Sequence, residues 1–138
     1  MRRFILSISA IALVSVGLFW VTRSVSAAPK GILGTWELVS GEVGGQAATG
    51  KQLKMISAHH FLWVAYDPKT MKTQGAGSGT YTLKGNSYVE HVEFFDVPGV
   101  EGMIGTDAKF TVKVVGDILT QEGTAGTAAI KETYKRLD

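Results

Sequence analysis

The sequence predicts an all-β, antiparallel fold, either a sandwich or a barrel. Short runs that alternate apolar and polar residues recur about every ten residues after residue 28, and this spacing is typical of such folds. Glycine, aspartate and asparagine separate the runs. In addition, no window of about a dozen residues in this part of the chain combines a 3.6-residue apolar period with helix caps.

The first half of this region contains four candidate strands: residues 33–43, 52–57, 61–66 and 79–83. The first alternates around Trp36, the second is short and half polar, the third is almost wholly apolar, and the fourth reads Gly-Thr-Tyr-Thr-Leu. Asp67-Pro68-Lys69-Thr70 places proline where a type I turn favours it. The glycine-rich residues 75–79 are interpreted as a flexible entry to the fourth strand.

The second half contains four more candidates: residues 87–95, 109–115, 118–122 and 130–137. Lys84-Gly85-Asn86 and Gly116-Asp117 are predicted to be tight hairpin links. Two connections are longer, residues 41–50 and 96–107. Long loops in a compact β domain often carry binding function.

Alternation along each run predicts which side chains face inward. In the sixth run the apolar set, Phe110, Val112 and Val114, is assigned to the core. In the last run the solvated set is Lys131, Thr133 and Lys135, so the inward set is Ile130, Glu132, Tyr134 and Arg136. In the fifth run Tyr88, Glu90, Val92 and Phe94 share one face, and which face lies inside is left open. Because buried charge is costly unless it is paired or solvated, this polar interior favours a water-containing ligand cavity.

Residues 1–27 resemble a secretory signal peptide. Met1-Arg2-Arg3 is cationic, residues 4–21 are apolar apart from three serines, and Val25-Ser26-Ala27 supplies small residues for cleavage. The alternative is a retained membrane anchor, although the apolar stretch is at the short limit for crossing a bilayer. We predict cleavage, one domain over residues 28–138, and a periplasmic or secreted product that does not associate with the membrane.

Charge and composition argue against several functional classes. Removing the three arginines of the leader from the 14 basic residues leaves 11, against 12 acidic residues in the domain. Such a balance gives no basic face for nucleic acid. The absence of cysteine excludes disulfides and thiolate chemistry. His59 and His60 face opposite sides of an extended strand, so no metal site is predicted, and no cofactor is expected.

Several motifs resemble those of known families. Gly34-Thr35-Trp36-Glu37-Leu38-Val39-Ser40 resembles the first-strand Gly-x-Trp signature of lipocalins and fatty-acid-binding proteins, and Tyr134-Lys135-Arg136-Leu137 resembles their last strand. Three middle segments resemble the lipocalin-like domain of unknown function found in exported bacterial proteins: His60-Phe61-x-Trp63-Val64-x-Tyr66-Asp67, Gly77-x-Gly79-Thr80-Tyr81 and Gly85-Asn86-x-Tyr88-x-Glu90. The resemblance spans residues 33–137. It implies a single antiparallel up-and-down β-barrel of about eight strands with a central pocket.

The resemblance also has consequences for the last strand. It implies that Arg136, placed near the open end, lies across Trp36, as the corresponding arginine does in lipocalins. Fatty-acid-binding proteins hold a ligand carboxylate with an Arg-x-Tyr pair, whereas the comparable pair here is Glu132-x-Tyr134. Because a carboxylate repels an anionic head group, the preferred ligand is expected to be neutral or cationic.

We predict a non-enzymatic protein that binds a small, mainly apolar ligand inside the barrel. Apolar walls with a few polar anchors are typical of such pockets. The predicted ligand-binding residues are Trp36, His60, Phe61, Trp63, Tyr66, Tyr81, Tyr88, Glu90, Glu132, Tyr134 and Arg136. No catalytic residue is predicted, because no base-activated nucleophile is evident.

Two other classes stay open. An isomerase or hydrolase would use Glu90 or Glu132 together with His60, and would need a carboxylate with a raised pKa in a cleft. A protein-interaction module would have a filled barrel and an exposed apolar patch. Neither the ligand nor the oligomeric state is predicted.

Overall fold

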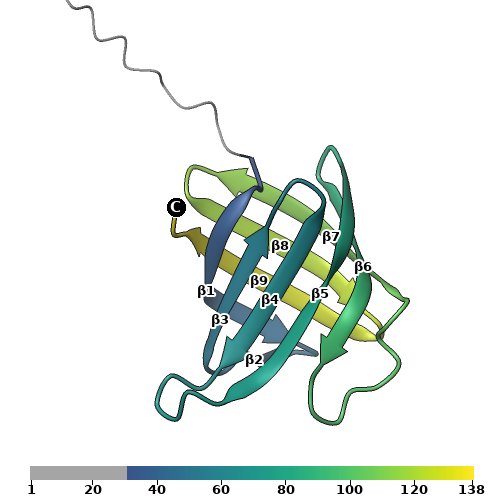
Figure 1. Cartoon of the computed structure of the whole chain (residues 1–138). Helices are drawn as coiled ribbons and strands as arrows, with labels where there is room; N and C mark the ends of the chain where they lie inside the picture. Colours follow the sequence, from purple (N-terminus) through teal and green to yellow (C-terminus); the bar gives the residue numbers. More distant parts are fainter. Residues whose placement is uncertain (1–30) are drawn as a thin grey trace, which may run out of the picture.

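The computed structural model describes residues 31–138, which form nine strands and no helix (Figure 1). The strands are β1 (Gly34–Val43), β2 (Gln46–Ala47), β3 (Lys51–Ile56), β4 (His60–Tyr66), β5 (Thr73–Lys84), β6 (Ser87–Asp96), β7 (Asp107–Val115), β8 (Ile118–Ala125) and β9 (Ala128–Arg136). No helix in this part of the chain is long and apolar enough to cross a membrane. The predicted signal peptide, residues 1–27, lies outside the described residues.

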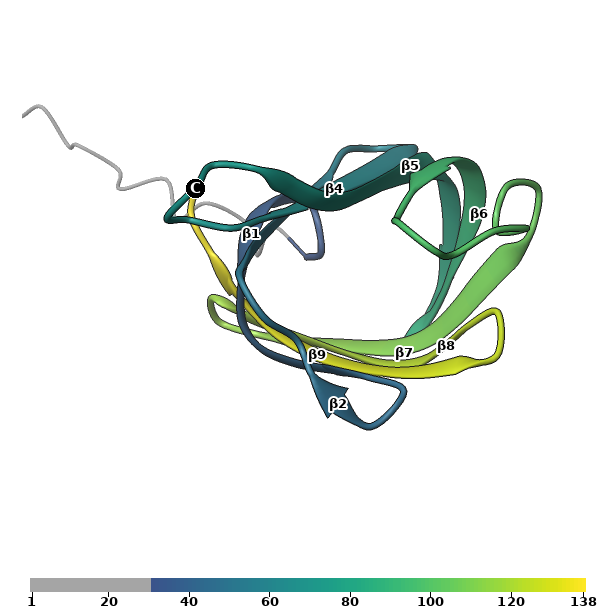
Figure 2. The same cartoon turned by 90° about the horizontal axis from the view of Figure 1, so that it is seen from below.

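Eight of the strands close into an antiparallel barrel. Hydrogen bonding follows the order β1-β3-β4-β5-β6-β7-β8-β9, and β1 also pairs with β9. Figure 2 shows the resulting ring of strands, with β2 paired to β1 outside it. Closure leaves the barrel without the unpaired edges at which open sheets tend to aggregate. The predicted all-β class and the antiparallel barrel are confirmed.

Every predicted run matches a strand, apart from the single residues Leu33, Ser57 and Leu137 at three run ends, but β5 is much longer than predicted. It begins at Thr73, so the interpretation of residues 75–79 as a flexible entry was wrong. A Cβ atom at Gly77 would lie 2.6 Å from Nε1 of Trp63, and one at Gly79 would lie 1.9 Å from the carbonyl oxygen of His91. These glycines therefore allow close packing inside a regular strand.

A β-bulge decides the inward face of β6. Tyr88, Glu90 and Val92 are buried, and simple alternation would also turn Phe94 inward. The register shifts, however: Gly79 pairs with Val92 whereas Ser78 pairs with Phe94, so an extra residue lies between them. Phe94 is consequently 49% exposed, and Phe95 takes its place inside. A bulge reverses alternation in this way because it inserts one residue into one strand only.

Most of the apolar core lies in one half of the barrel, at the end where short connections join β3 to β4, β5 to β6 and β7 to β8. This is the upper end in Figure 1, and we call it the closed end. The buried core residues are Ile32, Trp36, Ile56, Tyr88, Ala108, Phe110, Val112, Leu119 and Tyr134. Gly85 and Gly116 adopt positive φ angles of 61° and 57° in two of the short connections, which permits the tight hairpins that the sequence predicted.

Trp36 and Arg136 seal the closed end. The indole N–H of Trp36 donates to the carbonyl oxygen of Ile32 at 2.9 Å, and the guanidinium carbon of Arg136 lies 4.0 Å from the centre of the Trp36 ring system. Arg136 also donates to the carbonyl oxygens of Leu33 and Gly31. The stacking of Arg136 on Trp36 that the family resemblance implies is confirmed. It lies at the closed end of the barrel, whereas the resemblance had placed Arg136 near an open end.

Arg136→Lys is expected to lower the free energy of unfolding by about 1–2 kcal/mol, because lysine lacks the planar fork that stacks on an indole and bonds two carbonyls at once. Urea denaturation followed by far-UV circular dichroism measures the change. Lys135→Ala on the solvent-exposed face of β9 serves as the control, with an expected change within about 0.5 kcal/mol. Equal effects of the two substitutions would contradict a structural role for the stack.

Candidate ligand-binding cavity

A cavity of about 350 Å³ lies inside the barrel towards the end opposite Trp36. This volume falls within the range of roughly 300–1,000 Å³ that is usual for small-molecule sites. The longer connections lie at this end, the lower one in Figure 1. Residues from two of them contribute to the cavity lining: Ala48 and Thr49 between β2 and β3, and Val97, Val100 and Met103 between β6 and β7. We call this end the open end.

The cavity walls are largely apolar and aromatic. Trp63 and Phe95 meet edge to face, with ring centroids 5.9 Å apart and planes inclined at 72°. Gly77 lies directly beneath the Trp63 indole, which leaves room for this ring between β4 and β5. The inward position of Phe95 depends on the β6 bulge described above. Other wall residues are Phe61, Ala65, Val92, Ala108, Phe110 and Ile130.

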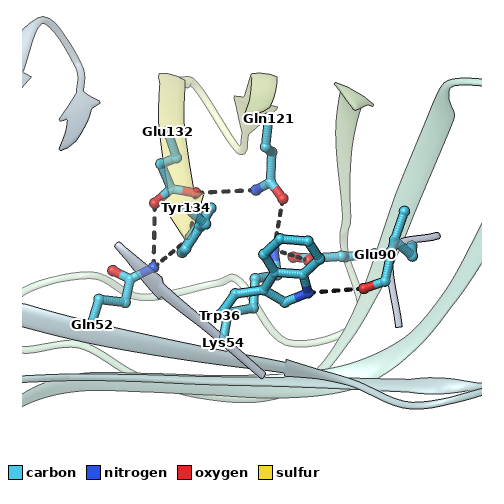
Figure 3. Close-up of polar contacts among 8 residues, drawn as sticks. Trp36, Gln52, Lys54, Glu90, Gln121, Glu132 and Tyr134 are labelled. Carbon is cyan, nitrogen blue, oxygen red and sulfur yellow. Dashed lines mark hydrogen bonds and ion pairs between the residues drawn. The ribbon is translucent and has the colours of Figure 1, made fainter. Parts of the chain in front are cut away.

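Six side chains that line the cavity form a connected polar cluster (Figure 3): Gln52, Lys54, Glu90, Gln121, Glu132 and Tyr134. At one side of this cluster, Nζ of Lys54 lies 2.6 Å from Oε1 of Glu90 and donates to Oε1 of Gln121 at 2.7 Å. Lys54 is 1% exposed and Glu90 is 4% exposed. An ion pair this deeply buried needs both charges, because neither alone would be compensated.

Aromatic rings surround the Lys54 ammonium group. The ring centroids of Tyr88, Phe110, Phe61 and Tyr134 lie 5.3, 5.7, 5.9 and 5.9 Å from Nζ. Cation–π attraction is strongest where water is excluded. The rings therefore hold the ammonium together with Glu90, so that Lys54 acts as an internal part of the barrel.

Glu132 occupies the other side of the polar cluster. Its Oε2 accepts hydrogen bonds from the Tyr134 hydroxyl at 2.8 Å and from Nε2 of Gln121 at 3.1 Å. Its Oε1 accepts one from Nε2 of Gln52 at 3.3 Å, and Gln52 also donates to the Tyr134 hydroxyl at 2.8 Å. Within residues 31–138, no lysine or arginine pairs directly with Glu132. Three neutral donors thus stabilise this carboxylate.

Burial keeps two phenols of this region neutral. Loss of solvation raises the pKa of Tyr134 well above its usual range, and the nearby Glu132 carboxylate raises it further. The pKa of Tyr88 is raised in the same way, first by burial and then by Glu90. Tyr134 therefore keeps the proton that it donates to Glu132 throughout the physiological pH range.

The cavity lining includes five of the predicted site residues: Phe61, Trp63, Glu90, Glu132 and Tyr134. Trp36, Tyr81, Tyr88 and Arg136 lie at the closed end, where the Tyr81 hydroxyl donates to the carbonyl oxygen of Ser57 at 2.7 Å. His60 and Tyr66 alternate with the inward residues of β4 and so lie on its outer face. The aromatic residues were predicted as one group because the sequence does not show at which height along the barrel each ring lies.

Three members of the polar cluster were missed: Gln52, Lys54 and Gln121. Alternation places Gln52 and Lys54 on the same face of β3 as Ile56, which is buried. That alternation was the available signal, but glutamine and lysine are mostly exposed in proteins. The partners that make burial of Lys54 tolerable come from β6 and β8, far away in the sequence.

No cluster of three or more histidine, aspartate or glutamate side chains suited to a metal ion occurs in residues 31–138. His91 pairs with Asp107 at 3.0 Å, with both side chains about half exposed. This pair lies outside the barrel cavity.

Comparisons with known proteins support the fold. No protein-family model matches the chain, and no match is found among curated proteins. The solved structure of an uncharacterized protein from Bacteroides eggerthii is similar, with a TM-score of 0.55 at 13% sequence identity. The match covers 76% of this chain and 98% of the other. At this identity the likeness concerns the barrel fold alone.

Proposed function

We propose that this chain is an exported, lipocalin-like binding protein that takes a small, mainly apolar ligand into its barrel cavity. The observation that carries the proposal is the aromatic-walled cavity of about 350 Å³ beside a buried polar cluster. Filling apolar walls with an apolar ligand removes them from water, which is worth about 25 cal/mol per Å² buried. The cavity is large enough for this gain to support binding.

The internal bonding of the polar cluster supports a preformed site. Lys54 is bonded to Glu90 and Gln121, and Glu132 is bonded to Gln52, Gln121 and Tyr134. Side chains held in this way need little rearrangement when a ligand enters, so less free energy is spent on ordering the site.

The bonding of Glu90 argues against one of the two carboxylates considered above as a catalytic base. A general base must reach the proton that it abstracts, whereas Glu90 is committed to an enclosed ion pair with Lys54. His60, the expected partner of that carboxylate in an enzyme, lies on the outer face of β4.

Export is supported by the leader-like composition of residues 1–27.

The neutral apolar dye N-phenyl-1-naphthylamine is expected to bind in the cavity and gain fluorescence. Ala65→Phe should weaken this binding at least about ten-fold, or about 1.4 kcal/mol, because Ala65 lines the cavity and a phenyl ring would occupy its volume. Leu62→Phe on the exposed face of the same strand is the matched control and should change the affinity little. An affinity for the dye that Ala65→Phe leaves unchanged would refute a ligand cavity. The absence of dye binding by folded wild type would refute it as well.

A further inference from the structure

We propose that the ligand carries a protonated amine, which the Glu132 carboxylate binds at the inner end of the cavity. This inference rests on the proposed binding function and specifies the head group. It follows from the balance of charge in the cavity and from the unused acceptor positions of Glu132 and Gln52. It also follows from the lack of an available lysine or arginine among the described residues that line the cavity.

The charge balance favours a cation. Among the described residues that line the cavity, the charged side chains are Lys54, Glu90 and Glu132. Lys54 and Glu90 neutralise each other at 2.6 Å. Glu132, 8% exposed, makes no ion pair with Lys54 and is connected to it by hydrogen bonds through Gln121. One negative charge therefore remains at the cavity, and an ammonium group would compensate it in a poorly solvated environment, where Coulomb attraction is strong.

The hydrogen-bonding geometry leaves room for a donor on the ligand. Oε2 of Glu132 already accepts two hydrogen bonds, whereas Oε1 accepts only the long one from Gln52, at 3.3 Å. A carboxylate accepts about four hydrogen bonds in total, so Oε1 retains capacity. Within residues 31–138, Oε1 of Gln52 accepts no hydrogen bond, although Nε2 of the same residue donates two. An ammonium group supplies three donors and no acceptor, which matches these two oxygen atoms.

An anionic head group would find no comparable partner. Lys54 is enclosed by Glu90, Gln121 and four aromatic rings. Arg136 lies at the closed end, stacked on Trp36 and bonded to backbone carbonyls. A carboxylate in the cavity would therefore face Glu132 without a counter-ion, and the like charges would repel each other.

Displacement of N-phenyl-1-naphthylamine by decylamine, decanol and decanoate at pH 7 tests the inference. The three ligands share one chain length and differ in charge at the head group. Wild type should bind decylamine at least about ten-fold more tightly than decanoate, with decanol between them. Glu132→Gln keeps the shape of the side chain and should remove most of the preference for decylamine, while leaving decanol affinity within about three-fold. Glu122→Gln, on the exposed face of β8, is the matched control and should keep the wild-type order.

The outcomes separate the inference from the function on which it rests. If the dye and decanol bind but wild type prefers decanoate, or if Glu132→Gln leaves the amine preference unchanged, the head-group inference is overturned and the binding function stands. If neither the dye nor any decyl compound binds to folded wild type, the proposed function itself fails. The wild-type comparison needs no variant, so it decides the question even if Glu132→Gln folds poorly.

Discussion

Lys54→Met is expected to lower the free energy of unfolding by about 3–5 kcal/mol, the usual range when one partner of a buried ion pair is removed. The substitution leaves Glu90 enclosed and without a counter-ion, because Lys54 is its ion-pair partner at 2.6 Å. It also removes the donor to Gln121 and the cation at the centre of four aromatic rings. Urea denaturation at pH 7 measures the loss.

The double variant Lys54→Met, Glu90→Gln shows whether the unpaired charge causes this loss. Removing both charges should recover at least half of the lost stability, because a neutral pair of similar volume avoids the desolvation of a lone carboxylate. Lys51→Met on the same strand is the matched control. It breaks the partly exposed ion pair with Glu37, and pairs of that kind contribute about 0–1 kcal/mol. A loss below about 1 kcal/mol in Lys54→Met would contradict the importance assigned to the buried pair.

Above pH 10, the two buried tyrosines are expected to make stability fall steeply. Burial raises the folded-state pKa of Tyr88 and Tyr134 above the unfolded value near 10. Unfolding above that pH therefore releases protons, so the stability from these phenols is fully present below pH 10 and is lost as the pH rises. Each phenol contributes a slope of about 1.4 kcal/mol per pH unit, and the two together about 2.7 kcal/mol per unit.

Urea denaturation at several pH values between 8 and 11 measures this slope. Tyr88→Phe should reduce the slope of the free energy of unfolding by about 1.4 kcal/mol per pH unit. The difference between wild type and variant removes the contributions of the titrating groups that both proteins share. Phenolate absorbance near 295 nm provides a second readout. The chain has four tyrosines, and two should ionise only as the protein unfolds. Ionisation of all four in the folded protein with a midpoint near pH 10 would contradict the burial of these phenols.

The local pattern of the sequence was sufficient to locate the barrel strands, although it missed residues 73–78 at the start of β5. Alternating runs and turn residues located all eight barrel strands, because side-chain alternation and tight turns depend on neighbours in the sequence. Alternation also placed Glu132 and Tyr134 inside. It failed in β6 beyond Val92, where the bulge reverses the faces of Phe94 and Phe95. A bulge is decided by pairing with β5, which alternation within β6 does not reveal.

The sequence by itself therefore determined the β class, the positions of the barrel strands along the chain and the inward face of β9. Only the tertiary structure decided which inward residues form the closed end and which line the cavity. It also decided that Lys54 is buried. The physical reason is that burial of a charge depends on its partners, and those of Lys54 are Glu90 on β6, Gln121 on β8 and rings from four strands. Barrel closure brings these groups together, and no local pattern in β3 encodes their positions.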